Sequence, residues 1–239
     1  MDPATLENLR QALLLFIVLM LSVALHEFGH AKVADLRGDP LPRAQGRVTL
    51  NPLAHWDFLG TLLPALFILG PALLGTGATG FVIGWGKPVM ISLPNPKTRV
   101  RDDILITLAG PAMNLLIALF AVVVGGLFIR FANAGDVPMP AETLQRVADF
   151  AELTVSMNIF LLAFNLLPLP PLDGSHILRH ALRMKDETYA WLLRNSFWIF
   201  LALVFIPVAG APLLSWISLP FRLLFGVPLT LLLRFIAGV

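Results

Sequence analysis

The chain contains no cysteine and very little charge. Only 13% of its 239 residues are Asp, Glu, Lys or Arg, about half the share that soluble domains usually carry. The absence of cysteine excludes a disulfide scaffold, a thiolate metal site and a cysteine nucleophile. A net charge of only +2 and high hydrophobicity exclude a disordered chain. So few charged residues would leave a soluble protein with a largely apolar surface.

Hydrophobic residues make up 57% of the chain, and they gather in long runs. A membrane-spanning helix needs about 20 mostly apolar residues, and only helices or closed barrels satisfy their backbone in lipid. The sequence therefore predicts an all-α polytopic membrane protein, a bundle of about five to six transmembrane or re-entrant segments. The runs occupy residues 12–25, 58–86, 104–129, 153–172 and 195–221, and a shorter run at 223–233 is either the end of a tilted span or an interfacial helix.

Two short stretches, residues 47–50 and 88–93, are typical of β-strands, because they are rich in β-branched residues and bounded by Gly, Pro and Asn. Lys and Arg are scattered through short polar loops, which gives no reason to expect a nucleic-acid partner. Their distribution instead predicts topology, since cytoplasmic loops carry an excess of them. The residues assigned to the cytoplasmic side are Lys32, Arg37, Arg43, Arg47, Lys87, Lys97, Arg99, Arg101, Arg179, Arg183, Lys185 and Arg194.

This assignment makes both flanks of residues 58–86 cytoplasmic. Those 29 residues would reach roughly 44 Å as a helix, enough for one crossing but short for two. A re-entrant hairpin that turns at the glycine-rich residues 75–80 would keep both basic flanks in the cytoplasm and would not need to cross the membrane twice. The alternative is a single crossing that breaks the positive-inside rule.

The first run continues into His26-Glu27-Phe28-Gly29-His30, an H-E-x-x-H motif. A cleaved signal peptide would end in small residues instead, so a retained helix is expected. On a helix, residues i and i+4 share a face, so His26 and His30 can reach one metal ion. Glu27 lies next to that site, where a carboxylate can take a proton from a metal-bound water. Three ionisable side chains in a membrane span are costly unless they bind something, which disfavours a chance match.

A catalytic zinc needs a third protein ligand. Asp173 is the candidate, because it stands at the end of the run 153–172, after three prolines that must unwind a helix. The predicted topology places it at the same cytoplasmic end as His30. The alternative is that Asp173 only caps the helix that begins at Gly174.

Together these motifs resemble the site-2 protease family of intramembrane zinc metalloproteases. The resemblance rests on H-E-F-G-H, on N-x-x-P-x-P-x-L-D-G at 165–174 and on A-G-P-A-M-N at 109–114. L-N-P-L-A-H-W-D at 50–57 and G-W-G-K-P at 84–88 are similar to the compact prokaryotic branch. The resemblance implies a single membrane-embedded protease domain over residues 1–239, with a catalytic core at about 9–182 and C-terminal transmembrane segments at about 191–237.

By resemblance, His26, His30 and Asp173 bind one zinc ion per chain, and Glu27 is the general base. Asn165 is then a contact for the substrate or the developing oxyanion, or else it forms a hydrogen bond between helices. Asn114 has the same two interpretations, with the structural one favoured because Gly110 and Pro111 suggest close packing.

Three further histidines have no assigned role. His176 and His180 are spaced i, i+4, and are interpreted as a second metal site, a gate, or polar residues at a wetted helix end. His55, next to a turn-rich loop, is either a ligand that plugs the site or a loop residue.

The resulting expectation is an intramembrane zinc metalloendopeptidase of the cell (inner or plasma) membrane, with its catalytic motifs toward the cytoplasm. Its partners would be the lipid bilayer and a transmembrane protein substrate, cut within or near its helix. Residues 47–50 and 88–93 could bind that substrate as an added β-strand. The alternatives are an intramembrane metal-ion transporter and a catalytically silent membrane-protein binder. The substrate and the oligomeric state do not follow from the sequence.

Overall fold

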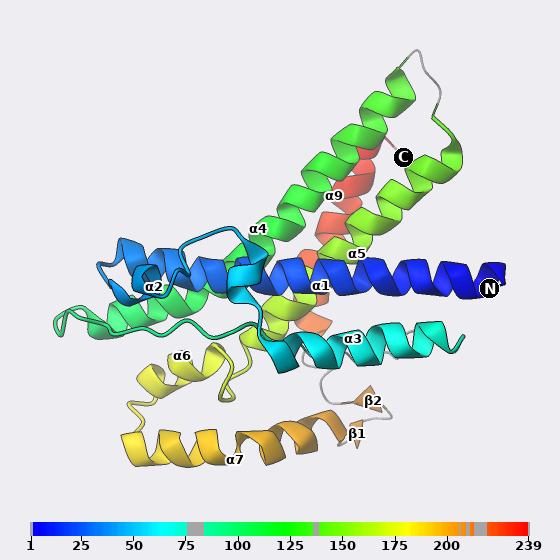
Figure 1. Ribbon diagram of the computed structural model, residues 1–239. Coiled ribbons are helices and arrows are strands. Elements are labelled where there is room, and N and C mark those ends of the chain that lie inside the picture. Colours follow the sequence, from blue (N-terminus) through cyan, green and yellow to red (C-terminus); the bar gives the residue numbers. More distant parts are fainter. Residues whose placement is uncertain are drawn as a thin grey trace. The chain divides into compact units, whose positions relative to one another are not determined.

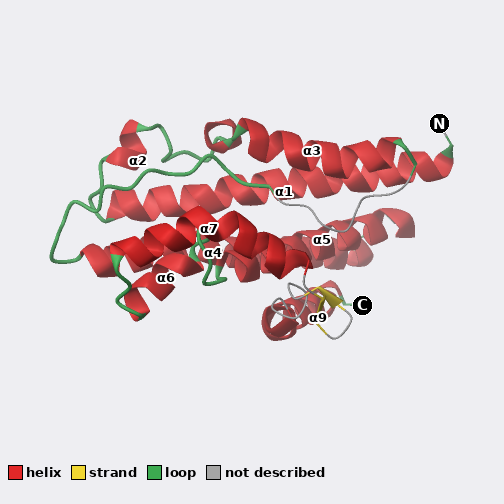
Figure 2. Cartoon of the chain, turned by 90° about the horizontal axis from the view of Figure 1, so that it is seen from below, coloured by secondary structure: helices red, strands yellow, loops and turns green. Residues whose placement is uncertain are grey.

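A computed structural model describes residues 2–75, 84–135, 139–205, 207–208, 211–212 and 219–238. Most of the described chain is helical, as Figure 2 shows. The chain divides into two compact units, Met1–Ser92 and Leu93–Val239. Four helices are long and apolar enough to cross a membrane: Pro3–Leu36, Arg99–Ala134, Ala141–Asn165 and Leu219–Ala237. These helices confirm the predicted helical, multi-pass character of the protein.

The first unit is organised along helix α1 (Pro3–Leu36), which passes through the H-E-x-x-H motif without a break. Helix α3 (Phe58–Leu73) runs beside α1, as Figure 1 shows, and the short elements α2 (Leu41–Ala44) and η1 (Pro52–His55) also pack against α1. Asp57 caps α3 by accepting a hydrogen bond from the N–H of Gly60 at 2.8 Å. The polar loop after α1 thus folds back onto the helix that carries the motif.

The two ends of the predicted hairpin meet. Trp56 and Gly86 form an isolated antiparallel β-bridge, and the N–H of Lys87 donates to the carbonyl of His55 at 2.8 Å. Helix α3 begins two residues after Trp56, and the chain has returned to Trp56 by Gly86. Residues 76–80 of the predicted turn lie outside the described residues. A segment whose ends are paired in this way favours a re-entrant hairpin over a single crossing.

The predicted strands at 47–50 and 88–93 are not strands. Residues 48–50 form bends, and residues 47 and 87–93 are irregular, with no ladder between the two stretches. Side chains take the backbone groups that a ladder would use: Gln45 Nε2 donates to the carbonyl of Met90 at 3.1 Å, and the N–H of Met90 donates to Gln45 Oε1 at 3.2 Å. The N–H of Ser92 donates to Asp39 at 2.5 Å. A local pattern cannot reveal this competition between side chains and strand pairing.

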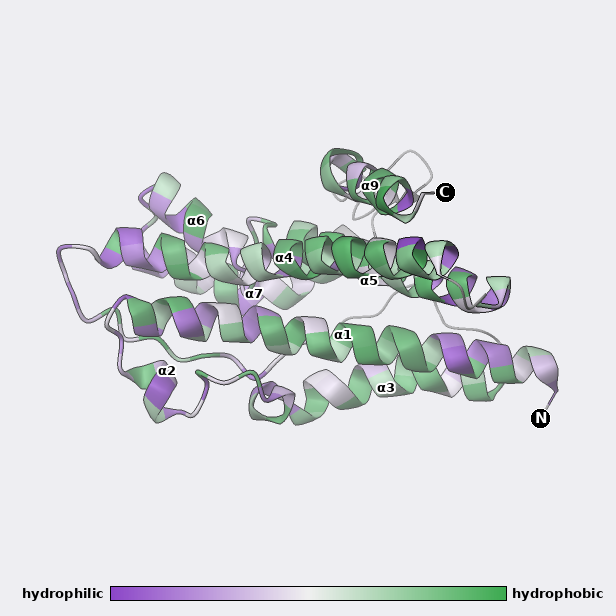
Figure 3. Cartoon of the chain, turned by 90° about the horizontal axis from the view of Figure 1, so that it is seen from above, coloured by the Kyte–Doolittle hydropathy of each residue, from purple (hydrophilic) through white to green (hydrophobic). Residues whose placement is uncertain are grey.

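The second unit is built on α4 (Arg99–Ala134), α5 (Ala141–Asn165) and α9 (Val227–Ala237). In Figure 3, hydrophobic colouring covers most of α4, as a lipid-facing helix requires. The core of this unit is a cluster of small and β-branched or leucine side chains from these helices: Ala118, Val122, Ala151, Val155, Ile159, Leu229 and Leu233.

The remaining elements are α6 (Gly174–Ala181), α7 (Asp186–Phe205), the two-residue strands β1 (Pro207–Val208) and β2 (Ala211–Pro212), and the π-helical segment η2 (Arg222–Gly226). Strands β1 and β2 pair antiparallel. The predicted run at 195–221 is described only in part: α7 ends at Phe205, and residues 206, 209–210 and 213–218 lie outside the described residues. The shorter run at 223–233 instead belongs to the helix Leu219–Ala237, which is long enough to cross.

Candidate metal centre

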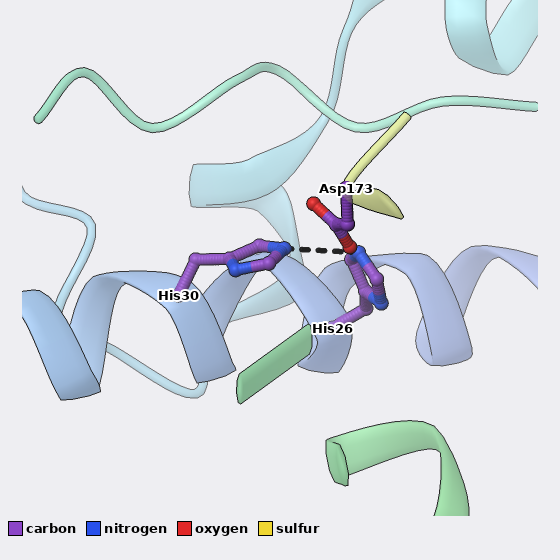
Figure 4. Close-up of side chains that lie close together, drawn as sticks. All are labelled: His26, His30 and Asp173. Atoms are coloured by element: carbon purple, nitrogen blue, oxygen red, sulfur yellow. Dashed lines mark hydrogen bonds between the residues drawn. The ribbon is translucent and has the colours of Figure 1, made fainter. Parts of the chain in front are cut away.

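Helix α1 brings the two histidines of the motif together. The helix starts at Pro3, and Asp2 caps it by accepting a hydrogen bond from the N–H of Thr5 at 2.7 Å, which lowers the pKa of Asp2. His26 and His30 lie one helical turn apart, and both are buried, at 7% and 8% exposure. Their Nε2 atoms are 3.1 Å apart, and their rings meet edge to face (Figure 4).

This histidine pair fits a zinc ion. Two nitrogen ligands about 2.0–2.1 Å from a tetrahedral zinc stand roughly 3.3 Å apart, close to the observed separation of the Nε2 atoms. The pair lies in the C-terminal third of α1, a helix that is long and apolar enough to cross a membrane. Burying two imidazoles there is costly unless they pair or bind something. The geometry therefore meets the first requirement of the predicted site.

Glu27 packs against Gly86, in the segment that follows the predicted hairpin turn. A Cβ atom placed on Gly86 would stand 2.6 Å from Cγ of Glu27 and 3.2 Å from Cγ1 of Val23. The backbone at Gly86 therefore touches the Glu27 side chain directly, and only glycine fits. The G-W-G-K-P motif thus lies against the H-E-x-x-H motif within one compact unit.

Asp173 belongs to the second unit. Helix α5 ends at Asn165, and turns and bends carry the chain through the prolines to Asp173, with a cis peptide bond between Pro170 and Pro171. Asp173 occupies the N-cap position of α6, yet its carboxylate makes no capping hydrogen bond. The capping interpretation therefore loses its support. Ligation of a metal ion by this carboxylate, as the third ligand beside His26 and His30, stays a prediction.

The two asparagines differ in their surroundings. Asn114 is completely buried, and its Nδ2 donates to Oδ1 of Asn158, also completely buried, at 3.0 Å. Asn158 in turn donates to the carbonyl of Thr154 at 2.9 Å. Asn165 is half-buried at the end of α5, and its Nδ2 donates to the carbonyl of Leu161 at 3.0 Å. Asn114 thus joins α4 to α5, while Asn165 is bonded within its own helix.

His55, the last residue of η1, is buried rather than exposed. Its exposure is 1%, and its Nε2 lies 2.9 Å from the carbonyl of Thr49. The guanidinium of Arg47 donates to the carbonyl of Ala54 next to it. These contacts tie the 47–57 loop together.

His176 and His180 meet a residue that the sequence reasoning missed. Asp103 on α4 lies 2.6 Å from Nε2 of His180 and 3.4 Å from Nδ1 of His176. Asp103 is only 6% exposed. The signal was present in the sequence, because Asp102 and Asp103 stand at the edge of an apolar run, where acidic side chains need partners.

Comparison with known proteins decides the family. The family model for peptidase family M50 matches residues 14–205. The chain belongs to peptidase family M50. This is the site-2 protease family, as the motifs predicted.

Relatives agree with this assignment. YwhC of Bacillus subtilis, named as a zinc metalloprotease, is 31% identical over 203 residues, covering 82% of either protein. Rip2 of Mycolicibacterium smegmatis, also named as a zinc metalloprotease, is 33% identical over 193 residues, covering 80% of this chain and 65% of Rip2. No solved structure matches the chain. The M50 chain is therefore a zinc metalloprotease with membrane-spanning helices.

Proposed function

We propose that this M50 protease is an intramembrane endopeptidase, which cuts another membrane protein within or near its transmembrane helix. The observation that carries the proposal is the position of His26 and His30 inside α1, a helix long and apolar enough to cross a membrane. A soluble substrate would have no path to buried side chains at that depth. A substrate that is itself a membrane helix reaches the same depth as the site.

The proposed metal ligands are His26, His30 and Asp173. Imidazole nitrogens and a carboxylate oxygen are a common ligand set for catalytic zinc, which keeps a fourth position open. The support is the spacing of the two Nε2 atoms and a carboxylate at Asp173 that is not used as a helix cap. Zinc bound by such ligands lowers the pKa of a coordinated water to about 7 and polarises a carbonyl oxygen.

Glu27 is the proposed general base. Its carboxylate takes a proton from the attacking water as the oxygen of that water bonds to the scissile carbonyl carbon. Glu27 then returns the proton to the leaving nitrogen as the C–N bond breaks. Contact with Gly86 restricts the Glu27 side chain, which keeps the carboxylate oriented for both transfers.

Asn165 is the proposed contact for the substrate or the developing oxyanion. Its amide is half-buried at the end of α5, eight residues before Asp173 in the chain. Only one of its amide hydrogens is needed for the bond to Leu161, so the other can serve a ligand. Asn114 is better suited to its structural role, because its side chain is fully buried against Asn158.

The substrate must be extended before it is cut, because a helix hides its carbonyls in its own hydrogen bonds. The segment that follows Gly86 offers an edge for an added strand. Gln45 and Asp39 bind the backbone of Met90 and Ser92 on one side. Val89 and Ile91 alternate with these two residues, and alternate residues of an extended stretch direct their backbone groups to opposite sides. Those of Val89 and Ile91 are the proposed partners of the substrate backbone.

Proline substitution tests this edge. V89P and I91P each remove one N–H and should slow cleavage, whereas V89A and I91A keep the N–H and serve as matched controls. The readout is the rate of cleavage of one good substrate. Proline variants that cut as fast as the alanine variants would rule out strand addition at this edge.

The proposed reaction is tested by co-expression with a panel of tagged single-span substrates. Wild type should yield a cut product near one end of the substrate helix, and E27Q should leave the same substrate intact. Metal uptake into vesicles that survives E27Q, without any cleavage by wild type, would instead support a transporter. The orientation proposed from the basic residues places the cut near the cytoplasmic end.

A further inference from the structure

Helix α6 begins directly after Asp173 and contains only eight residues, Gly174–Ala181. Isolated helices of this length are marginal in water, because nucleation costs more than so few hydrogen bonds return. Contacts with the rest of the second unit must therefore hold α6 in place. These contacts also determine where Asp173 lies.

A short polar contact joins α6 to Asp103 on α4. His180 Nε2 lies 2.6 Å from Asp103 Oδ2, and His176 Nδ1 lies 3.4 Å from the same oxygen. The two histidines are one turn apart, so both rings project from the same face of α6. The side chain of Asp103 is only 9% exposed, so losing its hydrogen-bond partners would cost free energy of folding. Helix α4 is long and well packed against α5 and α9, so it is a firm anchor for the carboxylate.

Asp173 is joined to α6 through the backbone. The N–H of His176 donates to the carbonyl of Asp173 at 3.0 Å, and Ser175 Oγ donates to the carbonyl of Leu172 at 2.7 Å. Gly174 lies so close to the carbonyls of Leu166 and Leu167 that a side chain there would collide with them. Movement of α6 therefore moves Asp173.

We propose that Asp103 is a positioning residue for Asp173: through His180 and His176 it fixes α6, and α6 fixes the metal-binding carboxylate. The inference rests on the proposed function, in which Asp173 binds zinc. It also gives the two histidines a role. A second metal site is disfavoured, because the candidate metal-binding group among the described residues includes neither His176 nor His180.

The test is zinc affinity, measured by competition with a chromophoric chelator on purified protein in detergent. D103N keeps the shape of the side chain but loses its charge and one acceptor oxygen. It should weaken zinc binding by about 10- to 100-fold, the usual loss when a supporting contact behind a ligand is removed. D102N is the matched control, since Asp102 is also buried but accepts a 2.6 Å hydrogen bond from Thr98 four residues earlier. D102N should bind zinc like wild type.

A second pair of variants keeps the test valid if D103N does not fold. H180Q retains a donor for Asp103 and should bind zinc nearly as tightly as wild type, whereas H180L has no donor and should show the weakened affinity. Cobalt-substituted protein gives a spectroscopic check: its absorption spectrum should change in D103N and H180L and stay unchanged in H180Q. If His180 only filled space, H180Q and H180L would have similar effects, so rescue by H180Q alone indicates the hydrogen bond to Asp103.

Two results separate the inference from the proposed function. If D173A binds zinc as well as wild type, the proposed ligand set is wrong. If D173A loses zinc while D103N and H180L keep wild-type affinity, the ligand set stands and the positioning role of Asp103 is wrong. Equal weakening in D102N and D103N would also overturn the role assigned to Asp103.

Discussion

Gly86 lies against Glu27, with room for a hydrogen but not for a methyl group between the glycine Cα and the glutamate side chain. This contact joins two motifs that are about sixty residues apart in sequence. It places the start of the proposed substrate edge next to the proposed general base. Substrate binding and proton transfer would therefore occur on neighbouring parts of one compact unit.

The G86A variant should lose most of its activity. Its Cβ would stand 2.6 Å from Cγ of Glu27, so the glutamate or the backbone must move. A displacement of about 1 Å near the reacting atoms can cost about 10²-fold in rate. The measurement is the rate of substrate cleavage together with zinc content, which should stay at the wild-type level. G70A is the control, because a Cβ on Gly70 meets nothing within 4 Å. Wild-type cleavage by G86A would show that Glu27 is not held by this contact.

Zinc should bind at about one ion per chain. H26A, H30A and D173A should each lower the zinc content after dialysis against a chelator, since each removes one of three proposed ligands. Metal analysis of the purified variants measures this directly. Full zinc content in H30A or H26A would contradict the pairing of the two Nε2 atoms as ligands.

The N114A variant should be less stable but no less competent per folded molecule. It leaves the buried side chain of Asn158 without the amide that it bonds, at a cost of about 1–2 kcal/mol. Unfolding in detergent, followed by tryptophan fluorescence, measures the loss. N195A is the control, because Asn195 is only half-buried and donates within its own helix as far as the structure shows, to Trp191. A stable N114A protein that fails to cut would instead make Asn114 part of the active site.

Single-cysteine labelling should place Gly38, Asn95 and Lys185 on the same side of the membrane, the cytoplasmic side. The chain has no cysteine of its own, so each engineered thiol reports alone. The expectation for Asn95 follows from the meeting of Trp56 and Gly86 at the two ends of the hairpin. Labelling of N95C from the outside only would make residues 58–86 a full crossing.

Much of the fold could be predicted from the sequence, because the membrane reduces the choice to helices. The long helices α1, α4 and α5 follow the predicted apolar runs, and α5 ends before the prolines that precede Asp173. The histidine spacing placed His26 and His30 on one face, since this needs only the period of a helix. Local patterns were sufficient wherever the interaction was also local.

The failures involve contacts between distant residues. Residues 88–93 looked like a strand, yet Gln45 and Asp39 bind their backbone with side chains. Asp103 was overlooked because its partner His180 lies 77 positions later. The end of α7 at Phe205 needs no distant contact, because the run 195–221 contains three prolines, the first of them at Pro207.

The substitution E27Q tests the central claim most directly. Glutamine keeps the size of the side chain and its contact with Gly86, but it cannot accept a proton from the attacking water. Zinc should stay bound and the substrate should still associate, while the chemical step falls by about 10²–10⁴-fold, as is typical when a general base is lost. The measurement is single-turnover cleavage of one tagged membrane substrate by wild type and E27Q, with zinc confirmed in both. The account predicts a cut substrate with wild type and an intact, bound substrate with E27Q; equal cleavage by the two proteins would contradict it.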